Sequence, residues 1–242
     1  MADRPASEEV AVSVVIPGYN EERNIENAVR RCLSALERSG LRHELIVVND
    51  ASTDRTGEIA ESLAINHPAI RVIHNPINLN VGLSVLIGMH AARGRLVTHN
   101  AMDLPFDPED LGRLLPMLDN ADIAVVVRKD RSAHSSWRKI TSIVHHWMVR
   151  ILFWTDIRDM NFVQAYRREV IQRLHVKAKS PAFVTPELLI RARRAAFRIV
   201  EMEADFHRRQ VGASSFGKSR DILWTFSDML SFWLEGGGRN KS

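Results

Sequence analysis

The sequence predicts an α/β protein with a mostly parallel β-sheet and helices on both of its faces. Short apolar runs rich in β-branched residues alternate with stretches of helical periodicity, and the connections between them are short. Continuous apolar runs of this kind are typical of parallel strands that helices cover on both sides. Since such sheets bind ligands at the C-terminal ends of their strands, we expect the functional loops there.

The first strand and the first helix set the pattern. Ala11 to Ile16 forms a β-branched run that stops at Pro17-Gly18, and apolar residues then recur at helical spacing from Glu21 to Arg38. Further strands are predicted at residues 44–48, 70–74, 96–98 and 121–127. Further helices are predicted at 55–66, 81–92 and 108–118. Polar loops follow the strands at residues 18–21, 49–54 and 100–103.

The second half has a less regular pattern. Helices are predicted at residues 137–153, 169–174 and 186–195, a strand at 197–202, and an aromatic-rich amphipathic helix at 222–234. A stretch at 161–166 has no assigned type. We expect flexible tails at residues 1–10 and 236–242.

The 242 residues, 45% of them hydrophobic, suffice for one large domain without disulfides. The single cysteine, Cys32, lies in an apolar helical pattern and is expected to be a packed thiol. The N-terminal residues lack the basic and apolar regions of a signal peptide, and no apolar run reaches the ~20 residues that cross a bilayer. We therefore expect a cytoplasmic protein without a membrane-spanning segment.

Charge is unevenly divided along the chain. Residues 1–127 carry a net charge of −7 and residues 128–220 one of +12, although the whole chain carries only +4. This asymmetry predicts an anionic partner for the second half, with a solvated basic helix face as the alternative.

Two motifs follow the first two strands. No G-x-G-x-x-G and no G-x-x-x-x-G-K-[ST] is present, which argues against dehydrogenases and P-loop nucleotidases. Residues 14–22 read VVIPGYNEE and residues 46–56 read IVVNDASTDRT. Both segments resemble the opening of the family 2 glycosyltransferases, which have the Rossmann-like GT-A fold. The resemblance continues to about residue 218, and within the family it is nearest to the dolichyl- and polyprenyl-phosphate sugar synthases.

The resemblance implies a nucleotide-sugar donor. It places the nucleotide against Pro17, Tyr19, Glu21 and Asp50, because a carboxylate at a strand end can accept hydrogen bonds from a base or bridge a ribose diol. A helix N-cap is the alternative role of Asp50, and capping is the expected role of Asp54.

The family's metal motif is altered in this chain. Ala101 stands where a first aspartate is expected, Asp103 keeps the second, and Pro105 replaces a glutamine. Asp103 is therefore the one predicted ligand of Mg²⁺ or Mn²⁺ and also contacts the donor, with His99, Asn100, Asp107 or His207 as helpers. Alternatively, the predicted catalytic residue Arg209 stabilises the diphosphate.

The acceptor implied by the resemblance is a polyprenyl phosphate. Arg128, Arg138 and Ser142 are the predicted phosphate ligands, because the arginine fork suits phosphate oxygens; ordinary surface charge is the alternative. Glu187, near the start of a predicted helix, corresponds to the general base of family members that act on hydroxyl groups. A phosphate acceptor needs no base, so Glu187 is alternatively a residue that favours a helix N-terminus.

These observations predict an inverting hexosyltransferase on the cytoplasmic face of a membrane. Residues 11–127 form its donor half, 128–218 its acceptor half, and 219–235 an amphipathic helix at the membrane interface. The predicted partners are a nucleotide-sugar, a polyprenyl phosphate, an anionic membrane surface and a membrane-anchored subunit, with no nucleic acid. Two alternatives stay open: transfer to a glycan or small-molecule hydroxyl, and a catalytically silent binding protein. The sugar and the nucleotide are not determined.

Overall fold

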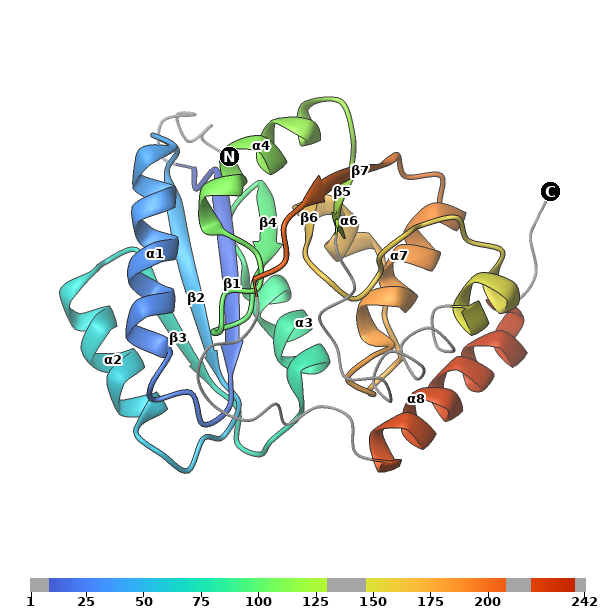
Figure 1. Cartoon of the computed structure of the whole chain (residues 1–242), viewed down its shortest axis with the longest axis horizontal. Helices are drawn as coiled ribbons and strands as arrows, with labels where there is room; N and C mark the ends of the chain where they lie inside the picture. The colour runs from blue at the N-terminus through green and yellow to red at the C-terminus, as the bar shows by residue number, and fades with distance from the viewer. Residues whose placement is uncertain (1–8, 130–146, 208–218, 238–242) are drawn as a thin grey trace, which may run out of the picture.

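The computed structural model of the 242-residue chain describes residues 9–129, 147–207 and 219–237. Figure 1 shows a sheet between two layers of helices, with α1 and α2 at one end of the molecule and α8 at the other. The predicted α/β class is confirmed, and the structure has a helix, α8 Ser219–Phe232, in the region of the predicted C-terminal helix.

A seven-stranded sheet organises the fold in the order β3-β2-β1-β4-β6-β5-β7. All neighbouring strands run parallel except β6, which is antiparallel to both β4 and β5. The strands are β1 Val12–Gly18, β2 His43–Asn49, β3 Ile70–His74, β4 Leu96–His99, β5 Ile123–Arg128, β6 Gln164–Arg167 and β7 Ile199–Ala204.

Helices connect and cover the strands. They are α1 Ile25–Arg38, α2 Thr56–Asn66, α3 Val81–Ala91, η1 Pro108–Asp110, α4 Leu111–Leu114, η2 Leu115–Asp119, α6 Arg168–Arg173, α7 Val184–Arg194, α8 Ser219–Phe232 and η3 Trp233–Gly237. Residues 147–153 are also helical. None of the described helices is long and apolar enough to cross a membrane.

Two hydrophobic cores lie on opposite faces of the sheet. Along β1, Val14 and Ile16 face the core under α1 and α2, whereas Val15 faces the core under α3 and α7. This alternation is the period of a β-strand buried on both sides. Cys32 lies in the first core, where burial raises the pKa of its thiol to about 12, so the predicted packed thiol is confirmed.

The second core joins α8 to the body of the protein. Phe153, Phe183 and Phe232 form a ring cluster with centroids 5.3–5.9 Å apart, so α8 and helix 147–153 pack against α7. The strand predicted at 197–202 is observed as Ile199–Ala204, and β6 lies in the stretch that the sequence left unassigned.

Candidate functional site

The loops that follow β1 to β4 meet at one edge of the sheet. Gly18 at the end of β1 pairs with Asn49 at the end of β2, which pairs with His74 at the end of β3. The backbone of Asn100 after β4 donates to Val15 of β1 at 2.9 Å. The predicted functional loops are thus brought together, as expected for parallel strands.

Hydrogen bonds join the first two loops. The backbone N–H of Asn20 donates to the Ser52 hydroxyl at 3.0 Å. The side chain of Asn20 donates to the Thr53 hydroxyl and accepts from the Thr53 backbone N–H. Asp54 accepts from the backbone N–H of Thr56 at 2.9 Å and from that of Glu22 at 3.2 Å. Asp54 thus satisfies a backbone donor at the start of α2, as the predicted capping role requires, although Arg55 holds the N-cap position of that helix.

Asp50 is almost fully buried, with 3% of its surface exposed. It accepts hydrogen bonds from the Asn75 side chain at 2.8 Å and from the backbone N–H groups of Leu79 and Asn80 at 2.9 Å each. These bonds fix the loop between β3 and α3, and they use three of the roughly four acceptor positions of a carboxylate. Asp50 therefore fixes the loops at this edge of the sheet and does not cap α2.

The other predicted nucleotide contacts surround the end of β1. Pro17 is buried in the strand, Tyr19 is 38% exposed, and Glu21 is half-buried with its carboxylate accepting from Asn24 at 2.6 Å. The backbone N–H of Glu21 donates to Thr56 at 2.8 Å, so the two motif loops hold it in place.

The loop after β4 carries Asp103. Asn100 holds this loop by donating to the carbonyl of Phe106 at 2.8 Å, and Met102 packs against Gly18 so closely that a Cβ on Gly18 would lie 2.4 Å from its sulfur. Asp103 itself is half-buried. Its place beside the end of β1 puts it in the same group of loops as Asp50.

Three of the four predicted metal helpers are engaged elsewhere. His99 is buried and bonded to Gln164 at 2.8 Å, and Asp107 pairs with Arg31 at 2.7 Å. Asn100 holds its own loop, whereas His207 is exposed. Within the described parts of the chain, no three His, Cys, Asp or Glu side chains gather to hold a metal ion.

The residues present still fit one type of metal site. Mg²⁺ is commonly held by one or two carboxylates together with substrate phosphates and water. Asp103 supplies one such carboxylate beside the loops that follow β1 and β2, so a cation there would need a substrate phosphate and water as its other ligands.

Arg128 ends β5 and is held on three sides. Its Nε and Nη2 donate to the two carboxylate oxygens of Asp159 at 2.7 and 3.0 Å. Its guanidinium carbon lies 5.3 Å from the ring centre of Phe162 and 5.7 Å from that of Phe206. Asp159 takes two of the five N–H donors of the fork, and its side chain is only 3% exposed. The arrangement fixes the guanidinium while leaving donors for an anionic ligand.

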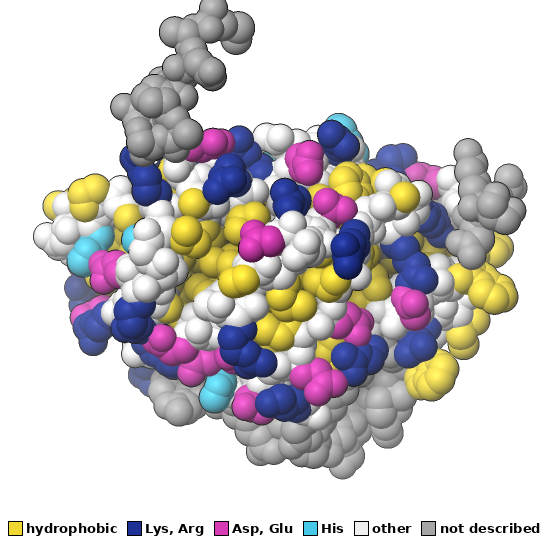
Figure 2. All heavy atoms as spheres, turned by 90° about the horizontal axis from the view of Figure 1, so that it is seen from above, with side chains coloured by type: hydrophobic (Ala, Val, Ile, Leu, Met, Phe, Trp, Pro, Cys, Tyr) yellow, Lys and Arg dark blue, Asp and Glu magenta, His cyan; other side chains and the backbone are white. Residues whose placement is uncertain are grey.

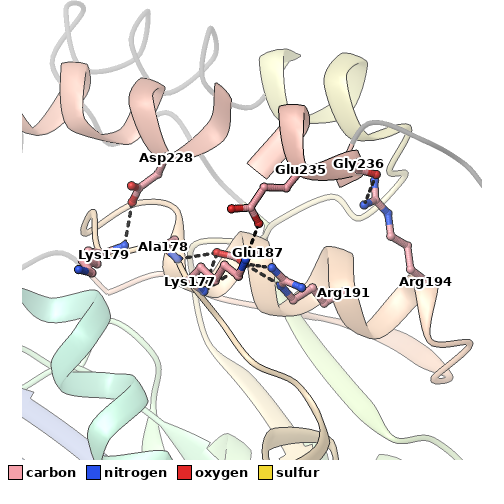
Figure 3. A network of polar contacts seen from close by, with 9 residues as sticks. All are labelled: Lys177, Ala178, Lys179, Glu187, Arg191, Arg194, Asp228, Glu235 and Gly236. Carbon is pink, nitrogen blue, oxygen red and sulfur yellow. Dashed lines mark hydrogen bonds and ion pairs between the residues drawn. The ribbon is translucent and has the colours of Figure 1, made fainter. Parts of the chain in front are cut away.

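Glu187 lies in the first turn of α7 with 1% of its surface exposed. Its carboxylate accepts from the backbone N–H groups of Lys177 and Ala178 at 2.6–3.2 Å and pairs with Arg191 at 2.6 Å, as Figure 3 shows. These contacts attach α7 to the segment before it. The predicted catalytic residue Arg209 and the predicted phosphate ligands Arg138 and Ser142 lie outside the described residues.

The aromatic side chains of α8, η3 and residues 147–154 differ in exposure. Phe153 and Phe232 belong to the core, and Trp224 is half-buried. The exposed group comprises Trp147, Trp154, Phe226 and Trp233, with 43–72% of their surface accessible. The sequence does not separate these groups, because the two apolar faces of α8 overlap in a single aromatic-rich pattern.

The exposed group belongs to a larger surface, which we call the apolar surface. α8 contacts the core through Thr225, Met229 and Phe232 and turns a second apolar face outward. A cleft of about 310 Å³ lies between this outward face and helix 147–153. The cleft is lined by Met148, Ile151, Leu152, Phe226, Leu230 and Trp233. The apolar surface consists of Trp147, Ile151, Trp154, Ile222, Leu223, Phe226, Leu230, Trp233 and Leu234. Figure 2 shows hydrophobic side chains at the same end of the molecule, beside Lys and Arg.

Sequence reasoning missed two residues that build the site. Asn80 caps α3 through its side chain and bonds to Asp50 through its backbone. Asp159, in the loop before β6, holds Arg128. The position of Asn80 directly before a helical run indicates an N-cap, so Asn80 could have been identified from the sequence. Asp159 could not, because its partner Arg128 lies 31 residues away in the sequence.

Comparisons with known proteins agree with the sequence motifs. The family model for glycosyl transferase family 2 matches residues 13–174. The chain is 32% identical to glycosyltransferase AglD of Haloferax volcanii, over 96% of this chain and 39% of that protein. It is 31% identical to an undecaprenyl-phosphate 4-deoxy-4-formamido-L-arabinose transferase of Edwardsiella ictaluri, over 85% of this chain and 63% of that protein. The chain thus spans less than two thirds of the length of either relative.

Solved structures share the fold. Glucosyl-3-phosphoglycerate synthase from Mycobacterium tuberculosis, in complex with Mn²⁺, UDP-glucose and phosphoglyceric acid, superposes with a TM-score of 0.71 at 21% identity, over 97% of this chain and 82% of that chain. The mannosyltransferase PcManGT from Pyrobaculum calidifontis, in complex with GDP-mannose and Mn²⁺, gives a TM-score of 0.58 at 18% identity, over 79% and 54% of the two chains. These likenesses identify the GT-A fold.

Proposed function

Because the chain belongs to glycosyl transferase family 2, we propose that it moves a sugar from a nucleotide-sugar to a polyprenyl phosphate at a membrane surface. The observation that carries this proposal is the apolar surface of α8 and helix 147–153 on the same domain as the donor loops. Monomeric soluble proteins rarely expose a contiguous apolar patch of this kind. Contact with a membrane would bury the patch and bring the protein to a lipid acceptor. The names of the Edwardsiella ictaluri relative and of a dodecaprenyl-phosphate galacturonate synthase from Rhizobium johnstonii, 28% identical, support a polyprenyl-phosphate acceptor.

The donor binds in this proposal at the carboxyl ends of β1, β2 and β4. Asp50 fixes the loop beside the base, Tyr19 and Glu21 flank the nucleoside, and Asp103 lies next to the diphosphate. A divalent cation bound by Asp103 and the diphosphate would neutralise charge on the leaving group. Mn²⁺ in the two structural neighbours supports this assignment.

The acceptor phosphate binds Arg128. Its fork is oriented by Asp159 and by two phenylalanine rings, so little side-chain entropy is lost when a phosphate binds. The phosphate oxygen attacks the anomeric carbon, the bond to the donor diphosphate breaks, and the nucleoside diphosphate leaves from the opposite face. No proton has to be removed, because the attacking oxygen is already an anion.

Transfer to a hydroxyl group is the second candidate, and Glu187 decides between the two. A general base must reach the substrate proton, but this carboxylate is buried and accepts from two backbone N–H groups and from Arg191. Its environment suits a structural role and therefore favours the phosphate acceptor.

The direct test is a transfer assay in detergent micelles. The full chain would be supplied with labelled UDP- and GDP-sugars and with undecaprenyl phosphate, and compared with soluble hydroxyl acceptors. We expect label in the lipid product only, and label in a soluble product would favour the second candidate. Absence of both products, with nucleotide binding retained, would favour a silent binding protein.

Membrane contact has its own test. Leu223 on the outer face of α8 and Leu234 in the adjoining η3 are each about 70% exposed. Replacing both with Gln should leave the free energy of unfolding within about 0.5 kcal/mol. The double variant should sediment less with liposomes in high salt, where charge attraction is screened and apolar burial remains. A double variant that sediments like the wild type would remove the apolar surface from the proposal.

A further inference from the structure

A second cavity lies where the ends of α6, α7 and α8 meet. Its volume is about 420 Å³, and it shares no lining residue with the donor loops. Its walls are formed by Arg173, Leu174, His175, Arg191, Arg194, Ala195 and Phe232. We call it the arginine pocket, because three guanidinium groups and no carboxylate line it.

Phe232 holds two of the arginines in place. The guanidinium carbons of Arg191 and Arg194 lie 4.8 and 5.5 Å from the centre of its ring. Figure 3 shows both side chains extending from α7, with Arg194 reaching the carbonyl of Gly236. Stacking on an aromatic face restricts a guanidinium while leaving its N–H edge available for oxygen atoms.

Two nearby carboxylates pair with arginines of the cavity walls, and a third pairs with Lys177. Glu187 pairs with Arg191 and accepts two backbone N–H groups, and Glu235 pairs with Lys177. Glu169 lies 3.6 Å from Arg173 on the exposed side of α6. Arg194 makes no ion pair within the described parts of the chain, and burial together with the charge of Arg191 lowers its pKa. Positive charges are therefore crowded here.

Helix ends account for part of this crowding. Arg173 and Arg194 lie in the last turns of α6 and α7, where the negative end of the helix dipole attracts cations. Each helix end contributes only about half a negative charge. Glu187 and Glu169 offset the charges of Arg191 and Arg173, which leaves Arg194 as the arginine of the pocket that pairs with no carboxylate in the described parts of the chain. Arg194 is therefore the residue that would attract an anion into the pocket.

We propose that the arginine pocket binds a phosphate-bearing anion. Guanidinium forks match phosphate oxygens, and the volume admits a phosphate with a small substituent. The pocket adjoins the apolar surface through Phe232 and its neighbour Trp233, so the phosphate of an acidic phospholipid would reach it from a membrane. This source rests on the membrane contact proposed above, whereas binding of free phosphate does not.

The first experiment uses the full chain and inorganic phosphate. Binding is measured by calorimetry without metal, at constant ionic strength, for the wild type, Arg194→Gln and Arg30→Gln. Arg30 is a matched control: it is 68% exposed on α1, and its replacement removes the same charge. We expect Arg194→Gln to weaken phosphate binding at least five-fold and Arg30→Gln to leave it unchanged.

The second experiment replaces phosphate with vesicles. Sedimentation with phosphatidylcholine vesicles containing phosphatidic acid is compared with that of pure phosphatidylcholine vesicles. A basic residue near an anionic leaflet contributes to the free energy of membrane binding. Losing Arg194 should therefore lower the partition coefficient on acidic vesicles about five-fold. Neither variant should change binding to the neutral vesicles.

The results separate the two sources. Binding of inorganic phosphate that depends on Arg194 supports a phosphate site, and a vesicle effect specific to Arg194 without phosphate binding assigns the site to a lipid headgroup. If Arg194→Gln and Arg30→Gln behave alike in both experiments, the proposal is overturned. The transfer assay in micelles reports the proposed function separately, since Arg194 lies outside the donor and acceptor sites.

Discussion

Replacing Asp159 with Asn tests whether Arg128 is oriented for a phosphate. The substitution keeps the shape of the side chain but removes its charge, and it turns an NH₂ group toward a guanidinium N–H. The two side chains are 16% and 3% exposed, and removing one partner of a buried ion pair costs about 3–5 kcal/mol. Because Arg128 is partly exposed and keeps its two ring contacts, the loss of unfolding free energy should be about 2–3 kcal/mol.

The same substitution should weaken acceptor binding selectively. A charged hydrogen bond is worth about 1.5–3 kcal/mol, so a misplaced fork should raise the KM for polyprenyl phosphate at least ten-fold. The KM for the nucleotide-sugar should stay within two-fold, because Asp159 lies in the loop before β6 and forms its ion pair with Arg128 at the end of β5.

Two measurements test this prediction. Urea unfolding gives the loss of stability, and transfer kinetics in micelles give both KM values. Glu203→Gln is the control, because it removes the same charge from an exposed ion pair with Arg158. An unchanged acceptor KM in an Asp159→Asn protein that is less stable would refute the role of Arg128 in acceptor binding while leaving the ion pair as a structural feature.

Three further predictions concern the donor edge and pH. Asp50→Asn should weaken nucleoside diphosphate binding about ten-fold in calorimetry, since an amide cannot accept from both Leu79 and Asn80; unchanged affinity would contradict the assignment. Asp103→Ala should abolish transfer in a folded protein, and chelation should stop the wild type; turnover after chelation would leave charge stabilisation to Arg209. Burial holds the pKa of His99 below its ordinary value, although its hydrogen bond to the Gln164 oxygen acts in the opposite direction. The unfolded chain therefore takes up a proton near pH 6.5 that the folded chain resists. Unfolding free energy should therefore fall below pH 6.5, less steeply in His99→Gln, and equal slopes would exclude His99 as the cause.

The donor half could be predicted closely because its signals are local. β1 and β2 are continuous apolar runs buried along almost their whole length, and the polar loops after them follow directly in sequence. Parallel pairing then brings Gly18 and Asn49 together without further information. Asp50 and Asp103, which the resemblance to the family predicts as site residues, lie in the loops that follow β2 and β4.

The acceptor half was harder to predict because its polar contacts join residues that lie far apart in the sequence. β6 has four residues, and its Gln164 is fully buried because it bonds to His99 and to the carbonyl of Met160. A buried glutamine gives no strand signal when its partner is 65 residues away. Glu187 likewise has the position of a general base in the sequence, but its role is set by the folding of Lys177 and Ala178 around it.

The segment 177–180 connects the two ends of the molecule. Asp228 of α8 accepts from the backbone N–H groups of Lys179 and Ser180 at 2.8 and 2.7 Å, and the carbonyl of Lys179 accepts from the side chain of Asn80 at 2.8 Å. The backbone of Asn80 in turn donates to Asp50 at 2.9 Å. α8 is thus joined to the donor edge by three successive hydrogen-bonded contacts. Since α8 also carries the apolar surface, a membrane bound there would fix the orientation of the donor loops relative to the lipid.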